Sequence, residues 1–343
     1  MKKLVIAFVL ITPFIFVACD KDEEDQPVAT PYTLVIPQGL PPMNIPSTNP
    51  LTVEGVALGK RLFYDPILSG NNTQSCASCH LQEYGFTDPN QFSTGIDGIQ
   101  GPRNAMPLIN LGWQTKFFWD GGANGLESQV MGPITNPIEM HETMANAVAK
   151  LNAHPEYPEL FKAAFGSSEV TSQNLMRAIA QFERTLISGN SKYDQYLRGE
   201  ALLTPQELSG KALFEDMDKG DCVHCHSAGS TFSDFEFRNT GLDSIPVDEG
   251  RYLITFNPSD RGKFKTPSLR NIELTGPYMH DGRFQTLLEC VEHYNTGFRY
   301  TENLDPNLFF AVKGRLSQQE MEDIVAFLKT LTDMEFVNNP DFH

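Results

Sequence analysis

The sequence places one five-residue pattern in the chain twice, as "CASCH" at residues 76–80 and as "CVHCH" at residues 222–226. The two copies begin 222 − 76 = 146 positions apart. Each copy follows a similar short stretch, "GKRLF" at 59–63 and "GKALF" at 210–214. A chemically specific pattern that recurs together with its flanking sequence indicates a duplicated module.

A second pair of segments supports the duplication and predicts the fold class. "SQNLMRAIAQFERTL" begins at Ser172, and "SQQEMEDIVAFLKTL" begins at Ser317, which is 145 residues later. In both, apolar residues recur at intervals of three and four, the spacing that places them on one buried face of a helix. Strand-like alternation is scarce, and long segments rich in Gly, Pro and Asn lie between the helices. We therefore predict a mainly α fold with long irregular loops, of the kind that usually shapes a site.

The repeated pattern has a chemistry of its own. Two thiols separated by two residues can add to the two vinyl groups of a haem, and the histidine that follows can ligate the iron. A structural zinc site needs four ligands close together, whereas 143 residues separate Cys79 from Cys222. A disulfide would not call for the same histidine twice, and a thioredoxin-like pair would need alternating strands and helices. The sequence therefore predicts two covalently bound haem c groups, held by Cys76, Cys79 and His80 and by Cys222, Cys225 and His226.

The N-terminus predicts export. Residues 1–19 combine two lysines, an apolar run and a small residue before Cys19, which is the pattern of a bacterial lipoprotein signal with a lipidated cysteine. A membrane anchor or an ordinary cleaved signal would also take the chain out of the cytoplasm. Residues 20–50 are acidic and then proline-rich, and we expect them to form a flexible tether. These features place the protein in the cell envelope, lipid-anchored and periplasmic, with the outer membrane as one alternative.

The charge of the chain restricts its partners. The formal net charge is −17, from 43 acidic and 26 basic residues. Such a surface repels nucleic acid and anionic membranes, and it is compatible with a cationic protein partner.

From about Leu51 to about Thr332 the chain resembles the bacterial di-haem cytochrome c peroxidases and their relatives of the MauG type. Besides the two haem patterns, the resemblance is carried by three stretches, which are "STGIDGIQGPRNA" at 93–105, "FFWDGGANGLESQVMGPITNPIEM" at 117–140 and "KTPSLRNIELTGPYMHDGRFQTLLECVEHY" at 265–294. It implies two fused cytochrome c-like domains, which we place at residues 51–198, with the haem that reacts with peroxide, and 199–335, with the electron-transfer haem. It also implies a homodimer.

The resemblance implies roles for four residues of the first domain. Trp119 would lie between the haems, and Gln129, Pro133 and Glu139 would line the pocket over the first iron. The Glu139 carboxylate could take a proton from peroxide and return it to the departing oxygen. On composition alone, Glu139 would be an acidic residue at a helix start and Trp119 would be a core aromatic.

The resemblance also implies a calcium ion between the domains. Its ligands would be the side chain of Asn104 and the backbone carbonyls of Thr275 and Pro277. Oxygen ligands suit this hard cation.

Two positions depart from the peroxidase pattern. Many peroxidases carry a histidine that caps the first iron at rest, and the matching residue here is Ile96, which cannot ligate iron. We therefore expect the first haem to be open to peroxide without activation. Where the peroxidases have an axial methionine on the second haem, this chain has Tyr294, as MauG relatives do. A phenolate ligand predicts a low potential. His293 and, less well, Met279 are the alternative ligands.

These features predict a peroxide-dependent di-haem oxidoreductase. Its electron donor would be a small redox protein such as a cytochrome c or a cupredoxin. The main alternative is a MauG-type oxidase that modifies a residue of a partner protein, which Ile96 and Tyr294 favour. A non-catalytic di-haem electron carrier is a further alternative, and Glu139 above an uncapped iron counts against it.

Overall fold

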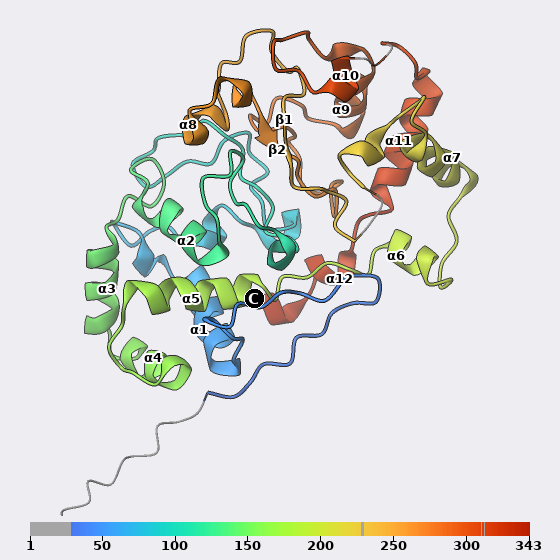
Figure 1. Ribbon diagram of the computed structural model, residues 1–343. Helices are drawn as coiled ribbons and strands as arrows, with labels where there is room; N and C mark the ends of the chain where they lie inside the picture. The colour runs from blue at the N-terminus through green and yellow to red at the C-terminus, as the bar shows by residue number, and fades with distance from the viewer. Residues whose placement is uncertain (1–28, 228–229, 310, 312) are drawn as a thin grey trace, which may run out of the picture.

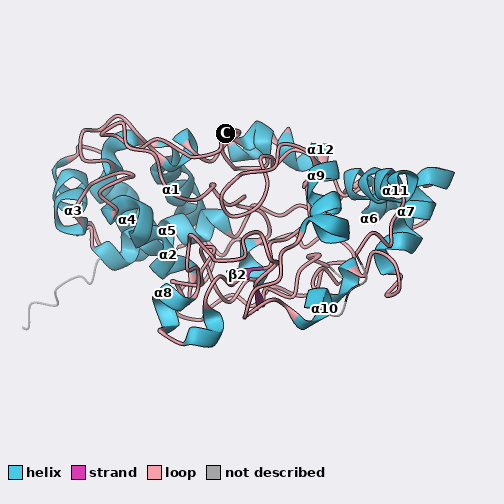
Figure 2. Ribbon diagram, turned by 90° about the horizontal axis from the view of Figure 1, so that it is seen from above, coloured by secondary structure: helices cyan, strands magenta, loops and turns pink. Residues whose placement is uncertain are grey.

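The structure is a computed structural model that describes residues 29–343 except 228–229, 310 and 312. The expected signal segment, with Cys19, lies outside the described residues. Two helical ends are joined by a middle region built mostly of loops (Figure 2). Over the described residues, strands are limited to β1 (Phe237–Arg238) and β2 (Phe264–Lys265), which pair antiparallel. The predicted mainly α fold with irregular loops is therefore confirmed.

The helices fall into two groups at opposite ends of the molecule (Figure 1). The first group is α1 (Val53–Tyr64), α2 (Leu126–Thr135), α3 (Met144–Ala153), α4 (Tyr157–Phe165) and α5 (Ser172–Glu183). The second group is α6 (Lys192–Leu197), α7 (Pro205–Glu215), α9 (Leu287–Glu292), α10 (Pro306–Phe309) and α11 (Gln318–Lys329). Two further helices are α8 (Tyr252–Thr255), beside the strands, and α12 (Met334–Val337), near the C-terminus.

The repeated "GK" stretches mark the same helix crossing in both groups. An ideal Cβ on Gly59 of α1 would lie 1.9 Å from the carbonyl oxygen of Ala178 in α5. An ideal Cβ on Gly210 of α7 would lie 1.8 Å from the carbonyl oxygen of Asp323 in α11. Only glycine permits backbones to approach this closely. The duplication seen in the sequence is thus a duplicated helix pair in space.

Capping residues define where the two paired helices of the second group begin. In α7 the side chain of Thr204 accepts a hydrogen bond from the amide of Glu207, whose side chain accepts one from the Thr204 amide. Pro205 occupies the first turn, where its missing N–H costs nothing. In α11, Ser317 and Glu320 form the same capping box.

The chain crosses between the two groups at places that differ from the expected boundaries. The helix α6, which we had placed in the first domain, packs in the core of the second, where the ring of Tyr193 lies 5.2 Å from that of Phe327. The end of the chain returns to the first domain, where Phe336 and Phe342 join the core around Phe86. Both crossings are set by aromatic side chains that need a buried surface and find it in the other domain.

Residues 29–50 do not form a free tether. They run along one edge of the molecule towards the second group and back (Figure 1). The Asn49 side chain is buried, where it donates to Glu127 and accepts from Gln181. The indole of Trp113 donates to the Pro41 carbonyl over 3.0 Å. A proline-rich sequence without periodicity can still be ordered by such side-chain contacts, which its composition does not reveal. Within the described residues, no helix is long and apolar enough to cross a membrane.

Candidate haem and peroxide site

Each haem pattern forms one tight turn. Cys76–Ser78 and Cys222–His224 are 3-10 turns. The backbone N–H of His80 donates to the Cys76 carbonyl over 3.0 Å, and that of His226 donates to the Cys222 carbonyl over 2.8 Å. The turn brings both thiols and the histidine of each pattern into one place, as covalent attachment of a haem requires.

The two histidines are oriented in the same way. His80 Nδ1 lies 2.8 Å from the carbonyl oxygen of Phe86, and His226 Nδ1 lies 3.0 Å from that of Phe232. Since a carbonyl only accepts, Nδ1 carries the proton and Nε2 keeps its lone pair for a metal. Burial lowers the pKa of both imidazoles and favours the neutral form that ligates iron. These residues fit haem c in both modules.

The pocket residues of the first module come from α2 and the segment after it. Gln129 and Pro133 stand one turn apart in α2. Glu139 follows, and its Oε1 accepts a hydrogen bond of 2.6 Å from the Asn136 side chain. Burial raises the pKa of the Glu139 carboxyl, which favours a group that holds and releases a proton.

Glu139 lies within electrostatic reach of the first haem-attachment turn. Burial raises the pKa of the Cys76 and Cys79 thiols, and the charge of Glu139 adds to the rise at both. The backbone N–H of Ile96 donates to the Glu139 carbonyl over 3.0 Å. An ideal Cβ on Gly95 would lie 2.2 Å from the carbonyl of Ile138, so the two segments are in close contact. The structure thus brings together Ile96 and Glu139, which are 43 residues apart in the chain.

Trp119 lies at the junction of the two modules. Its Nε1 donates to the Asn104 carbonyl over 2.9 Å, and its own carbonyl accepts from the amide of Lys265 in β2 over 2.7 Å. The indole is thereby tied to a loop of the first module, and the Trp119 backbone is tied to a strand of the second.

The expected calcium residues are buried near the same junction. Asn104, Thr275 and Pro277 are all buried. The Asn104 amide nitrogen donates to the carbonyls of Asn90 and Gln91, each over 3.2 Å, which leaves the amide oxygen as the atom available to a cation. No group of three or more His, Cys, Asp or Glu side chains among the described residues could hold a metal ion. A site here would rest on amide and carbonyl oxygens, and it stays a prediction.

The second module places Tyr294 in an uncommon turn. The helix α9 continues into a π-helix at His293–Gly297, a form that is frequent at functional sites. Burial raises the pKa of the Tyr294 phenol, and the Cys225 and Cys222 thiols contribute, which places Tyr294 near the second attachment turn.

The alternative ligands of the second module are placed differently. The Nε2 of His293 lies 2.9 Å from the carbonyl oxygen of Thr240, so that nitrogen is already in a hydrogen bond. Met279 is half-buried in a left-handed turn with φ of 71°. Tyr294 as the ligand of the second haem stays a prediction.

Comparison with known proteins decides the family. Residues 53–202 match the family model for di-haem cytochrome c peroxidase, and residues 208–332 match that for cytochrome c. The methylamine utilization protein MauG of Methylorubrum extorquens is 40% identical over 290 residues, which are 83% of this chain and 80% of that protein.

This chain belongs to the di-haem cytochrome c peroxidase and MauG family.

Other relatives span both branches of that family. The cytochrome c551 peroxidase of Nitrosomonas europaea is 40% identical over 303 residues, or 87% of this chain and 84% of that protein. A crystal structure of a MauG-like protein associated with microbial copper homeostasis has a TM-score of 0.85 and 38% identity, over 91% of this chain and 99% of that one. Because the chain is similar both to MauG proteins and to cytochrome c peroxidases, similarity alone does not distinguish the two activities.

Two buried charged residues of this family member were missed by sequence reasoning. Glu183 in α5 is 4% exposed, its Oε2 has no hydrogen-bond partner, and burial raises its pKa to about 8. The 145-residue repeat offset gives a signal that would have found it, since Leu328 is its counterpart. Lys265 is 2% exposed, and burial lowers its pKa to about 7. Its Nζ lies 2.5 Å from the side-chain oxygen of Gln114, beside Trp119.

Proposed function

We propose that this protein is a peroxide-dependent di-haem oxidoreductase that reduces hydrogen peroxide at an open first haem, with ligation of the MauG kind. The observation that carries the proposal is the pairing of Glu139 with Ile96. A half-buried carboxyl with a raised pKa would face the first haem site, and the adjacent position, from which a capping ligand would come, holds an alkyl side chain.

The residues of the first module have separate roles in the proposed reaction. His80 and the thiols of Cys76 and Cys79 would hold the first haem, which when bound supplies the redox chemistry of the reaction. Glu139 takes a proton from peroxide and returns it to the departing oxygen, and Asn136 keeps the carboxyl in place. Gln129 orients the peroxide or the water that forms. Pro133 lines the same face of α2 without a backbone donor that would compete for the oxygen.

Electrons would reach the first module through the second. His226 and Tyr294 would ligate the second haem, with Cys222 and Cys225 as its covalent anchors. Reduction of one peroxide to two waters consumes two electrons and two protons. Trp119, fixed by hydrogen bonds to both modules, offers the connecting path. A phenolate on the second haem would keep its potential low.

The source of those electrons separates two versions of the proposal. A small cytochrome c or cupredoxin as donor makes the protein a peroxide-scavenging peroxidase. A side chain of a partner protein as donor makes it a MauG-type oxidase, and Ile96 and Tyr294 favour that version. A non-catalytic carrier would have no use for a proton-holding Glu139. From the N-terminal pattern we also propose a lipid-anchored location in the cell envelope. From the resemblance we propose a calcium ion at Asn104, Thr275 and Pro277, and a homodimer.

The test is steady-state peroxide consumption by the holoprotein with a reduced small cytochrome c as donor. The proposal expects two donor molecules to be oxidised for each peroxide consumed, and expects the Glu139→Gln variant to be strongly impaired. Peroxide consumption that requires a partner protein, with oxidation of one of its residues and no turnover of the small donor, would select the oxidase version. The proposal would be contradicted if the unaltered protein and the Glu139→Gln variant both consumed peroxide at the background rate with either donor.

A further inference from the structure

The two modules exchange the segments that follow their last helices. After α5 the chain leaves the first module, and α6 packs in the core of the second. After α11 the chain leaves the second module, and α12 with the turn Pro340–Phe342 packs in the core of the first. The sequences of these exit segments, at 188–197 and 333–343, have no evident similarity. Each segment nevertheless packs in the core of the other module.

The exit segments meet where they cross. Asp333 Oδ2 accepts hydrogen bonds from Ser188 Oγ over 3.2 Å and from the amides of Gly189 and Asn190, each over 2.9 Å. Its Oδ1 accepts from the amide of Phe336 and so begins α12. The carboxylate of Asp333 therefore joins the two exit segments where they cross.

The C-terminal exit segment covers the residue that orients His80. Phe86, whose carbonyl lies 2.8 Å from His80 Nδ1, is fully buried. Its ring lies 5.7 Å from that of Phe336 and 6.0 Å from that of Phe342. The side chain of Gln82, in the same loop, donates to the Asn339 carbonyl over 2.8 Å. This loop is therefore packed against the tail of the other module.

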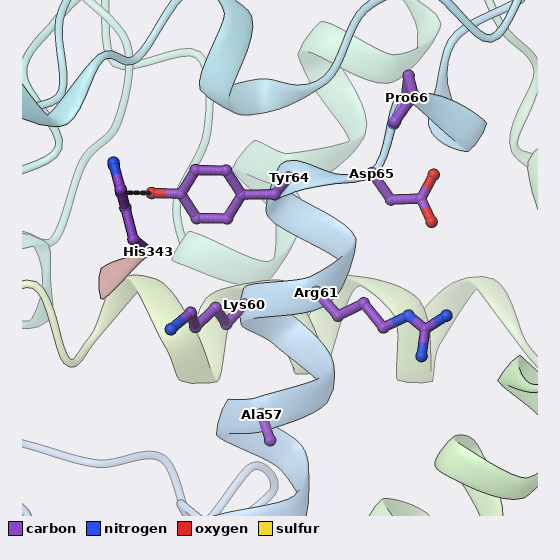
Figure 3. Close-up of a pocket in the computed structure, with 7 residues that line it drawn as sticks. All are labelled: Ala57, Lys60, Arg61, Tyr64, Asp65, Pro66 and His343. Atoms are coloured by element: carbon purple, nitrogen blue, oxygen red, sulfur yellow. Dashed lines mark hydrogen bonds between the residues drawn. The ribbon is translucent and has the colours of Figure 1, made fainter. Parts of the chain in front are cut away.

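The chain end is fixed to the first module as well. The Nδ1 of His343 lies 3.4 Å from the hydroxyl of Tyr64 in α1, beside a shallow pocket on that helix (Figure 3). Lys60, in the same helix, donates to the Asp341 carbonyl over 2.9 Å. None of the candidate catalytic residues lines that pocket.

The first exit segment covers the equivalent residue of the second module. Phe232, whose carbonyl lies 3.0 Å from His226 Nδ1, is also buried. Its ring lies 5.7 Å from that of Tyr193 in α6. Arg270 lies 5.8 Å from the Phe232 ring and forms a buried ion pair of 2.8 Å with Asp194, the next residue in α6. Both phenylalanines have positive φ, 59° and 51°, a conformation that non-glycine residues hold only when their surroundings impose it.

We propose that each exit segment positions the residue that orients the haem histidine of the other module. Phe336 and Phe342 hold the Phe86 carbonyl against His80, and Tyr193 holds the Phe232 carbonyl against His226. A firm hydrogen bond from Nδ1 makes the imidazole a stronger donor to its metal, which stabilises the oxidised iron and lowers its potential. Each haem is thus tuned by a segment that belongs to the other module. This inference rests on the proposed ligation of the haems by His80 and His226.

The test uses matched leucine variants of the holoprotein, Phe336→Leu and Tyr193→Leu, with Phe161→Leu as control. Phe161 is a fully buried aromatic of the first module in a core cluster that does not contain Phe86. Haem content is measured first, and then a spectroelectrochemical titration gives both potentials, with electron paramagnetic resonance separating the two irons by spin state. We expect Phe336→Leu to raise the potential of the first haem alone, Tyr193→Leu to raise that of the second alone, and Phe161→Leu to raise neither.

A second variant covers the case in which Phe336→Leu fails to fold. Phe342→Leu removes only the second ring that packs on Phe86, at 6.0 Å, and it should shift the first potential in the same direction by less. Unshifted potentials in folded, di-haem Phe336→Leu or Phe342→Leu protein would overturn the inference. A shift in the wrong haem, or an equal shift in Phe161→Leu, would also overturn it. Absence of covalent haem from the unaltered protein would instead overturn the proposed function.

Discussion

The two modules hold their histidines alike and differ in which other side chains lie near the haem-attachment turn. In both, a turn of two cysteines presents an imidazole whose Nδ1 is bonded to a phenylalanine carbonyl. Near the first turn lie the carboxyl of Glu139 and the alkyl side chain of Ile96. Near the second lies the phenol of Tyr294, in a π-turn. The residues that would bind the haem are shared by the two modules. The residues that differ between the modules would give the two haems different roles.

The largest expected effect is on the acid of the first module. Glu139→Gln keeps the size of the side chain and removes its proton transfer, so the rate of peroxide reduction should fall by roughly two to four powers of ten with both haems attached. Stopped-flow or steady-state peroxide consumption measures this. Glu142→Gln is the control, because Glu142 is a nearby carboxylate engaged with Lys150 over 2.7 Å. An unchanged rate in Glu139→Gln would remove this residue from the mechanism.

The buried carboxyl of Glu183 should make the stability of the first module depend on pH. Its pKa is raised from 4.5 to about 8, so the folded state keeps a proton that the unfolded state releases. The free energy of unfolding therefore falls as the pH rises from about 4.5 to about 8, and the loss is on the order of 3 kcal/mol. Glu183→Gln cannot release this proton and should escape the loss.

Urea unfolding at pH 5 and pH 8 checks the Glu183 prediction. The difference between the two pH values should shrink in Glu183→Gln and stay the same in Glu159→Gln, which alters an exposed carboxylate of α4. If both variants kept the full pH dependence of the unaltered protein, Glu183 would be ionised in the folded state.

The second module should respond to its own ligand. Tyr294→Met replaces a phenolate by a thioether and should raise the potential of the second haem on the order of 0.1 V, within the range of about 0.8 V that axial ligands span. The first haem should keep its potential. A redox titration of Tyr294→Met beside His293→Gln distinguishes the two candidates. A shift in His293→Gln and none in Tyr294→Met would make His293 the ligand.

A smaller effect is expected from making the first module resemble the peroxidases that are capped at rest. If the histidine introduced by Ile96→His ligates the first iron in about nine of ten molecules, about a tenth of the protein stays reactive. Its reaction with peroxide should then slow about tenfold. Ile96→Leu keeps an alkyl side chain and should react like the unaltered protein. Equal rates in the two variants would show that position 96 does not face the first iron.

The features that the sequence predicted are those encoded by short local patterns. The haem turns and the repeated helix pair each depend on neighbouring residues and formed as expected. The proximity of Ile96 and Glu139 followed from the family resemblance, and the structure brings the two together.

The features that the sequence did not predict depend on contacts between distant segments. Nothing in "FVNNPDFH" indicates that it packs against Phe86, some 250 residues earlier, and nothing in the composition of residues 29–50 indicates that Asn49 is buried. Burial of Lys265 was also hidden, because a charged residue is expected to be solvent-exposed unless its surroundings are known, whereas burial of Glu183 was signalled only by the repeat offset that pairs it with Leu328.

In the proposed mechanism the first module is open to peroxide, and reduction of the second is not needed to open it. The decisive measurement is rapid mixing of the fully oxidised holoprotein with one equivalent of hydrogen peroxide, without reductant. We expect a change of the Soret band at the first rapid-mixing time points, abolished or greatly slowed in Glu139→Gln and unaffected in Glu142→Gln. No spectral change until one haem has been reduced would contradict it, and would mean that another side chain caps the first iron at rest.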